Sequence, residues 1–172
     1  MKPALLLLLA VNLFIACKKD PEPSRYWGEA TAIINGKPWT AHPIAWLSPV
    51  SGNNCLIEID SIDQFAALRQ GLDFFKVPFK PGTHPVVNSD SQVDDTLVGA
   101  DFYYLDYDVL YGNYKILEAD SSSFVNLQSY DSITKELRGS FNLTFIATLK
   151  PAGEPDTLRV RNGTFHTRVR EQ

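Results

Sequence analysis

The chain has 172 residues, a formal net charge of -4 and 44% hydrophobic residues. This length suits one domain, and the apolar fraction is too high for a disordered chain. The acidic balance argues against a nucleic-acid partner, and two cysteines are too few for a disulfide scaffold.

The N-terminus has the organisation of an export signal. Met1–Pro3 carries one positive charge, and residues 4–16 are apolar except for Asn12. This run is shorter than the roughly 20 residues that a membrane span needs, but it suits the apolar region of a signal peptide. A polar, proline-rich stretch follows Cys17. The sequence therefore predicts a signal peptide over residues 1–16, a tether over residues 17–25 and a single β domain over residues 26–172.

The segment Phe14-Ile15-Ala16-Cys17 resembles the lipobox of bacterial lipoproteins, although Phe14 and Ile15 depart from its commonest pattern. The resemblance implies that Cys17 becomes the new N-terminus and carries a diacylglycerol. Two or three acyl chains hold a soluble domain stably on a bilayer. Lys18 stands where an aspartate would imply inner-membrane retention, so we expect an outer-membrane location, periplasmic or surface-exposed. The alternatives are an ordinary cleaved signal with a coincidental cysteine, or a buried N-terminal helix.

The first part of the domain contains two short-range signals. Asn35-Gly36 predicts a hairpin turn, because both central turn positions favour residues that accept a positive φ. Pro38 follows it and is tolerated only at a sheet edge. Cys55, Ile57 and Ile59 alternate with more polar neighbours, so we expect Cys55 to be a small buried hydrophobe. Residues 61–71 fit either a short helix begun by a capping box or a bent strand leading into residues 72–77.

An aromatic stretch over residues 101–114 follows. Its alternation places Tyr103, Tyr107 and Tyr111 on one side of a strand and Phe102 and Tyr104 on the other, and Gly112-Asn113 is predicted to turn the chain. The tyrosines stand among aspartates, a mixture that stacks on sugar rings or peptides and forms hydrogen bonds with them. The alternative is that one aromatic row lies in the core. Candidate ligand-binding tyrosines are Tyr103, Tyr104, Tyr107 and Tyr111.

The C-terminal third has the clearest strand pattern. Phe141, Leu143 and Phe145 alternate with polar residues, which predicts a half-buried antiparallel strand. The inward-facing residues before and after Asn162-Gly163 have opposite parity, so that dipeptide must form a turn or a bulge. Together the segments predict an all-β fold with about eight or nine strands and little helix. The expected architecture is an antiparallel β-sandwich or a small barrel.

Several segments together resemble a family of small Bacteroidetes outer-membrane lipoproteins of unknown function. They cover residues 32–41, 80–83, 137–141 and 160–165. The resemblance implies an all-β lipoprotein of the cell envelope and supplies no active-site residues. Four Asp-Ser/Thr-aliphatic triplets also resemble the acceptor of Bacteroidetes O-glycosylation, and Asp-Ser and Asp-Thr are equally natural turn pairs. The implied acceptors are Ser61, Thr96, Ser132 and Thr157.

Arginines on the last strands form a second candidate set. They are predicted to face outward beside His166 and to receive an anionic glycan or an acidic partner, or else to form a solvated strand face. The set is Arg159, Arg161, Arg168 and Arg170.

No pattern predicts a cofactor or a catalytic centre. The three histidines lie far apart without metal-ligand spacing, and there is no nucleophile elbow or phosphate-binding loop. Acidic residues concentrate between positions 88 and 131, which indicates solvated loops or a calcium site formed by some of Asp94, Asp95, Asp101, Asp106 and Asp108. The sequence therefore favours a lipid-anchored binding or accessory module with a glycan or envelope-protein partner over an enzyme. The alternatives are a structural envelope protein and a hydrolase using loop carboxylates.

Overall fold

The computed structural model describes residues 25–171 except residues 50 and 92–96. The predicted signal peptide, Cys17, Thr96, Asp94 and Asp95 lie outside the described residues. The described part of the chain contains ten β-strands, a single 3-10 turn at Ser89–Ser91 and no α-helix. The strands are β1 (Glu29–Ile34), β2 (Lys37–Leu47), β3 (Asn54–Ile62), β4 (Leu68–Pro78), β5 (Gly82–Asn88), β6 (Val98–Asp106), β7 (Val109–Ile116), β8 (Phe124–Tyr130), β9 (Glu136–Leu149) and β10 (Thr157–Arg170).

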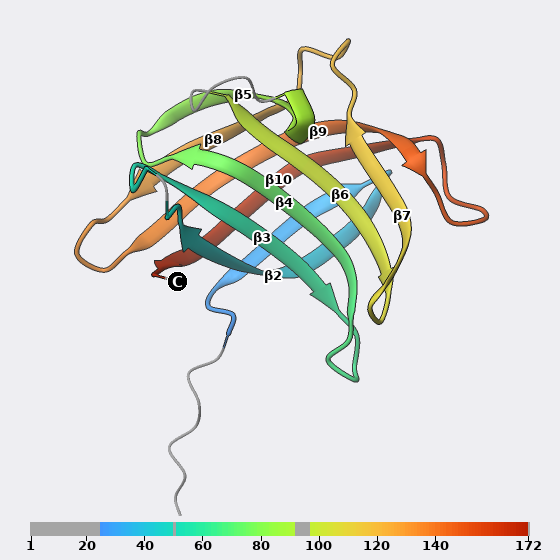
Figure 1. Cartoon of the computed structure of the whole chain (residues 1–172), viewed down its shortest axis with the longest axis horizontal. Helices are drawn as coiled ribbons and strands as arrows, with labels where there is room; N and C mark the ends of the chain where they lie inside the picture. Colours follow the sequence, from blue (N-terminus) through green and yellow to red (C-terminus); the bar gives the residue numbers. More distant parts are fainter. Residues whose placement is uncertain (1–24, 50, 92–96, 172) are drawn as a thin grey trace, which may run out of the picture.

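The strands form one ring-like sheet. Neighbours pair in the circuit β1, β2, β3, β4, β6, β7, β9 and β10, and β10 pairs again with β1. β5 and β8 complete a second connection between β6 and β9. Only β5–β6 and β2–β10 are parallel among the described pairings. Figure 1 shows β3, β4, β6 and β7 crossing in front of β8, β9 and β10, with β2 at the lower edge of the ring.

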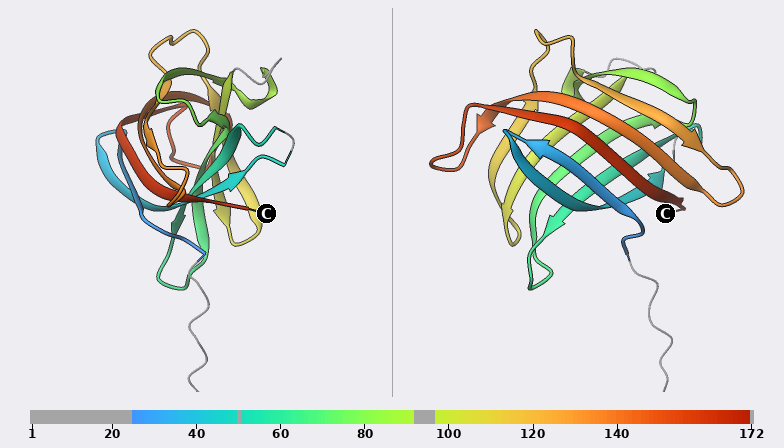
Figure 2. Two further views of the ribbon diagram at one scale, coloured as in Figure 1. Left: turned by 90° about the vertical axis from the view of Figure 1, so that its left-hand side faces the viewer. Right: turned by 180° about the vertical axis from the view of Figure 1, so that it is seen from behind.

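The all-β, mainly antiparallel prediction is confirmed. Of the two arrangements that the sequence left open, the closed circuit corresponds to the small barrel, which we call the ring (Figure 2). Closure leaves most strands with a partner on both sides, so few backbone N–H and C=O groups remain at a free edge.

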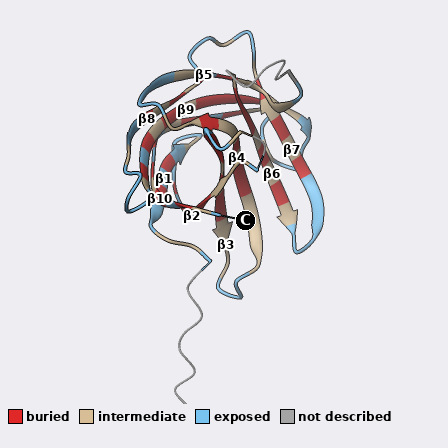
Figure 3. Cartoon of the chain, turned by 60° about the vertical axis from the view of Figure 1, so that its left-hand side comes forward, coloured by how far each residue is buried: buried red, intermediate tan, exposed pale blue. Residues whose placement is uncertain are grey.

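The core fills the inside of the ring. Buried segments run along the strands from both halves of the sheet (Figure 3). The Phe74 and Phe141 rings lie 5.3 Å apart, and the Phe102 and Phe145 rings 6.0 Å apart, so β4 and β6 pack against β9. Cys55 is fully buried, as predicted, and burial raises the pKa of its thiol to about 12.

Two predicted local features of the chain are confirmed. Asn35 and Gly36 have φ angles of 48° and 81° and join β1 to β2. A register shift lies between Val160 and Gly163, and Asn162 has a φ of 53°. This bulge lets inward-facing residues on both sides of it reach the core. Gly163 then packs so closely that a Cβ atom there would lie 2.3 Å from Cε2 of Phe141.

The aromatic stretch turns earlier than predicted. β6 ends at Asp106, the chain turns at Tyr107-Asp108, and Gly112 and Asn113 lie inside β7. The predicted turn at Gly112-Asn113 is therefore wrong. Position 112 has room only for glycine, because it lies opposite Tyr104 and a Cβ atom there would lie 2.9 Å from Cδ2 of that ring.

The chain between β3 and β4 is a turn and not the predicted short helix. The Asp63 carboxylate accepts hydrogen bonds from the backbone N–H groups of Phe65 and Ala67, and Ala66 has a φ of 60°. These bonds stabilise a tight turn at the position where a capping box was expected. The alternative prediction of a strand is confirmed by β4.

Candidate ligand pocket

A pocket opens at the end of the ring where the β1–β2 turn and the β9–β10 loop meet. In Figure 1 this loop projects on the right-hand side. The pocket has a volume of about 430 Å³, within the range of small-molecule sites. Its lining comprises Ile34, Asn35, Lys37, Pro38, Trp39, Gln70, Tyr104, Gly153, Glu154, Pro155 and Leu158.

The pocket floor comes from Trp39 on β2 and Tyr104 on β6. Pro38 lies in the part of β2 that pairs with β1 and not with β3 among the described strands, which provides the edge position that proline needs. The next residue, Trp39, therefore faces inward, and its indole N–H donates to Oε1 of Gln70 at 2.8 Å. This bond joins β2 to β4 and fixes both side chains at the pocket.

A tyrosine ladder links the floor to the solvent. The ring centroids of Tyr114 and Tyr104 lie 5.9 Å apart, and those of Tyr104 and Tyr111 lie 6.0 Å apart. Tyr114 is buried, Tyr104 is 6% exposed and Tyr111 is 39% exposed. Burial, followed by the nearby Glu154 charge, raises the pKa of the Tyr104 hydroxyl. The hydroxyl is therefore a neutral hydrogen-bond donor at any physiological pH.

The same tyrosines hold the β9–β10 loop across the ring end. The Tyr114 hydroxyl donates to the carbonyl of Pro155 at 2.9 Å, and the Tyr104 hydroxyl donates to Oε2 of Glu154 at 3.4 Å. Lys150 adds an ion pair with Asp156 at 2.6 Å. These contacts position Glu154 over the floor, so the pocket wall is preorganised.

Two hairpins form an aromatic rim near the pocket. Arg69 on β4 pairs with Asp63 and Asp106, and its guanidinium lies 4.8 Å from the centre of the Tyr107 ring. Tyr107 is 65% exposed and Phe65 is 74% exposed. The predicted binding residues Tyr104, Tyr107 and Tyr111 therefore lie at one end of the ring, from the floor to the rim.

Tyr103 belongs to a different surface, on the outer face of the ring. Its hydroxyl contacts Asp73 at 3.4 Å, and Glu58, Asp73 and Asp101 lie in register on β3, β4 and β6. Burial, with the charges of Glu58 and Asp60, raises the pKa of Asp73 to about 7. The structure thus separates Tyr103 from the other three predicted tyrosines.

The four predicted arginines divide into separate places along β10. Arg159 and Arg161 line a second, shallower depression of about 650 Å³ beside the pocket. Arg170 lies at the far end of β10 and lines a small depression with Tyr130. The set is therefore not one continuous patch.

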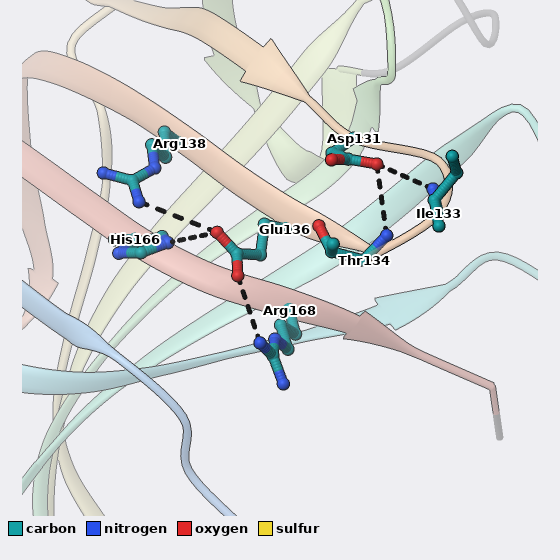
Figure 4. Close-up of polar contacts among 7 residues, drawn as sticks. All are labelled: Asp131, Ile133, Thr134, Glu136, Arg138, His166 and Arg168. Atoms are coloured by element: carbon teal, nitrogen blue, oxygen red, sulfur yellow. Dashed lines mark hydrogen bonds and ion pairs between the residues drawn. The ribbon is translucent and has the colours of Figure 1, made fainter.

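Arg168 belongs to a cluster around Glu136. Glu136 lies 3.1 Å from Arg168, 3.2 Å from His166 and 3.6 Å from Arg138 (Figure 4). Hydrogen bonds from Arg168 and His166 lower the pKa of Glu136. Arg168 also lies 4.0 Å from the centre of the Trp27 ring, so it fixes the start of the described chain on the ring.

The predicted glycosylation acceptors differ in access. Ser132 is exposed in a turn whose Asp131 carboxylate accepts hydrogen bonds from the backbone N–H groups of Ile133 and Thr134 (Figure 4). Ser61 in β3 and Thr157 at the start of β10 are half-buried. Ser132 is therefore the most accessible of the three described acceptors.

No described group of three or more His, Cys, Asp or Glu residues is arranged to hold a metal ion. Among the residues of the calcium hypothesis, Asp101 accepts a hydrogen bond from Ser89, and Asp106 pairs with Arg69. Asp94 and Asp95 lie outside the described residues, so calcium binding there stays a prediction.

Sequence reasoning missed Gln70 and Glu154. Gln70 lies 31 positions from its partner Trp39, and Glu154 lies 50 positions from Tyr104. Neither residue belongs to a sequence motif. Each comes close to its partner only because the ring closes. The glycine at position 112 is the nearest local signal, since it marks close packing beside Tyr104.

Comparisons with protein-family models, curated proteins and solved structures found no match. No helix in the described residues has the length and hydrophobicity needed to span a membrane. The fold and the site together define an all-β ring domain with an open pocket of mixed aromatic and polar lining at one end.

Proposed function

We propose that this protein is a lipid-anchored module of the cell envelope that binds a glycan in the pocket at the end of the ring. The observation that carries the proposal is the lining itself. Trp39 and Tyr104 form a largely buried aromatic floor, and Gln70 and Glu154 provide hydrogen-bonding groups beside it.

This combination suits a sugar. The C–H face of a sugar ring packs on an indole or phenol ring, and its hydroxyls need amide and carboxylate partners. The ladder from Tyr104 to the half-exposed Tyr111 extends the aromatic surface from the floor toward solvent. The pocket therefore favours an oligosaccharide over a purely apolar ligand.

Binding is favoured over hydrolysis. Glycoside hydrolysis ordinarily uses two carboxyl groups that flank the scissile bond about 5–10 Å apart. Glu154 is the one carboxylate among the described residues that line the pocket. A hydrolase using loop carboxylates would need a second acid at this site.

The start of the described chain is held on the ring by side-chain contacts with β3. In Figure 1 the described chain begins at the lower edge of the ring, and the β9–β10 loop projects on the right-hand side. Arg25 lies 3.6 Å from Glu58, and the Tyr26 hydroxyl donates to Asp60 at 2.8 Å, so the start of the domain is fixed on the ring. In this proposal the lipid on Cys17 is joined to the domain through this segment.

A glycan array followed by calorimetric titration tests the proposal. Each oligosaccharide that binds the wild-type domain is titrated against Gln70→Ala and Glu154→Gln, with the exposed Gln128→Ala as the matched control. We expect at least tenfold weaker binding for the two pocket variants and unchanged binding for Gln128→Ala. Folded wild-type protein that binds no oligosaccharide would overturn the proposal and favour a structural envelope protein.

A further inference from the structure

We infer that the bound glycan carries an anionic group, a carboxylate or a sulfate, and that Arg159 holds this group outside the pocket. The inference rests on the proposed glycan-binding function. It concerns the depression beside the pocket, which Ile33, Thr157, Arg159 and Arg161 line.

The pocket and the depression are adjacent. Asn35 and Pro155 line both of them. Pro155 belongs to the loop that covers the ring end, and Asn35 belongs to the β1–β2 turn. A chain of sugars that extends from the pocket over these two residues would reach the arginine side.

The boundary between the two is rigid. The Asn35 backbone N–H donates to the carbonyl of Arg159 at 2.9 Å, and the Arg159 N–H donates to Oδ1 of Asn35 at 2.9 Å. Asn35 also contacts the carbonyl of Thr157. The turn is thus fixed to β10 at Arg159, so the pocket wall and the Arg159 backbone keep the same relative position.

The two arginines differ in what they contact. Arg161 is half-buried and donates to the carbonyl of Leu143 at 2.6 Å and to Oγ1 of Thr144 at 2.9 Å. Its charge also adds to the hydrogen bonds from Ser122 and Thr144 that lower the pKa of Asp120 to about 2. Arg161 is therefore largely satisfied within the fold.

Arg159 has an exposed side chain and forms no ion pair within the described residues. The nearby acids are engaged elsewhere, because Asp156 pairs with Lys150 and Glu154 accepts from Tyr104. An unpaired guanidinium presents a planar set of donors that matches a carboxylate or a sulfate. Because Arg159 lies beside a pocket of sugar size, we expect it to bind an acidic sugar that is linked to the sugar in the pocket.

An array that carries each oligosaccharide backbone in neutral, uronic and sulfated forms tests the inference. We expect the wild-type protein to bind an acidic form about three- to tenfold more tightly than its neutral counterpart, and this preference to shrink as NaCl is raised. Arg159→Gln should remove the preference and leave neutral binding unchanged, whereas the exposed Arg138→Gln should preserve both.

The uronic and sulfated forms distinguish the two anions. Neutral binding without acidic preference, or a preference that survives in Arg159→Gln, would overturn this inference alone. Absence of binding to every form would overturn both the inference and the proposed function.

Discussion

Replacing Gly163 by alanine should destabilise the ring, because the position has no room for a side chain. The added Cβ atom would lie 2.3–2.5 Å from three atoms of the Phe141 ring. Phe141 is 1% exposed and packs against Phe74 at 5.3 Å, so its ring has no space to move into.

The expected cost follows from two opposing effects. Overpacking a well-filled core costs about 1–3 kcal/mol. Replacing glycine by alanine in a strand raises the unfolding free energy by about 0.5–1 kcal/mol, because the unfolded chain has less conformational freedom. The net loss of unfolding free energy is therefore about 0–2.5 kcal/mol, and a loss of about 1 kcal/mol near the middle of this range lowers Tm by about 2–4 °C for a domain of this size.

A double-mutant cycle with Phe141→Leu isolates this contact. The smaller leucine makes room for the new Cβ atom, so the double variant should be more stable than the sum of the single effects by about 1 kcal/mol. Gly52→Ala is the matched control, because Gly52 has a φ of 62° and no atoms within 4 Å of the added Cβ. Its strain should add to Phe141→Leu without coupling. Urea unfolding measures all variants, and additivity of Gly163→Ala with Phe141→Leu would refute the reasoning.

Four further predictions concern the loop, the acidic face, the anchor and the modification. Tyr114→Phe removes the hydroxyl bond to Pro155 and should lower the unfolding free energy by about 1 kcal/mol in thermal unfolding; no change would show that this bond does not stabilise the loop. Asp73 has a folded-state pKa raised from 3.8 to about 7, so the folded state binds the extra proton between these values and the wild type should lose stability as pH rises from about 4 to about 7. Asp73→Asn should reduce this slope in urea unfolding at pH 5 and 8, and an unchanged slope contradicts the assignment. Cys17→Ala should move the protein from the membrane to the soluble fraction, and unchanged partitioning would refute lipidation. The intact mass of natively expressed protein should include a sugar, with Ser132 as the first acceptor to map, and a mass with lipid but no sugar would refute glycosylation.

Features that depend on neighbouring residues could be predicted from the sequence. The turn at Asn35-Gly36 follows from two residues that accept a positive φ, and the bulge at Asn162-Gly163 follows from a change of parity within one strand. The burial of Cys55 follows from its alternating, apolar context. Each of these features depends on residues that are close together in the sequence, so the sequence pattern is enough to predict it.

The pocket could not be predicted in the same way. The contact of Trp39 with Gln70 depends on how the ring closes. A glycine in the sequence can indicate either a turn or close packing. At Gly112 the reason is close packing against Tyr104, and the prediction of a turn was wrong. The tyrosine pattern pointed to the stretch of chain that contributes Tyr104 to the pocket, but the early turn at Tyr107 placed Tyr103 on a different surface from Tyr111.

Titration of the tightest array ligand into the wild-type protein and Glu154→Gln tests the central claim most directly. We expect saturable binding with one site on the wild type and at least tenfold weaker binding on Glu154→Gln, with the same Tm for both proteins. Equal affinity for the two proteins would contradict the assignment of the glycan to the pocket at the end of the ring.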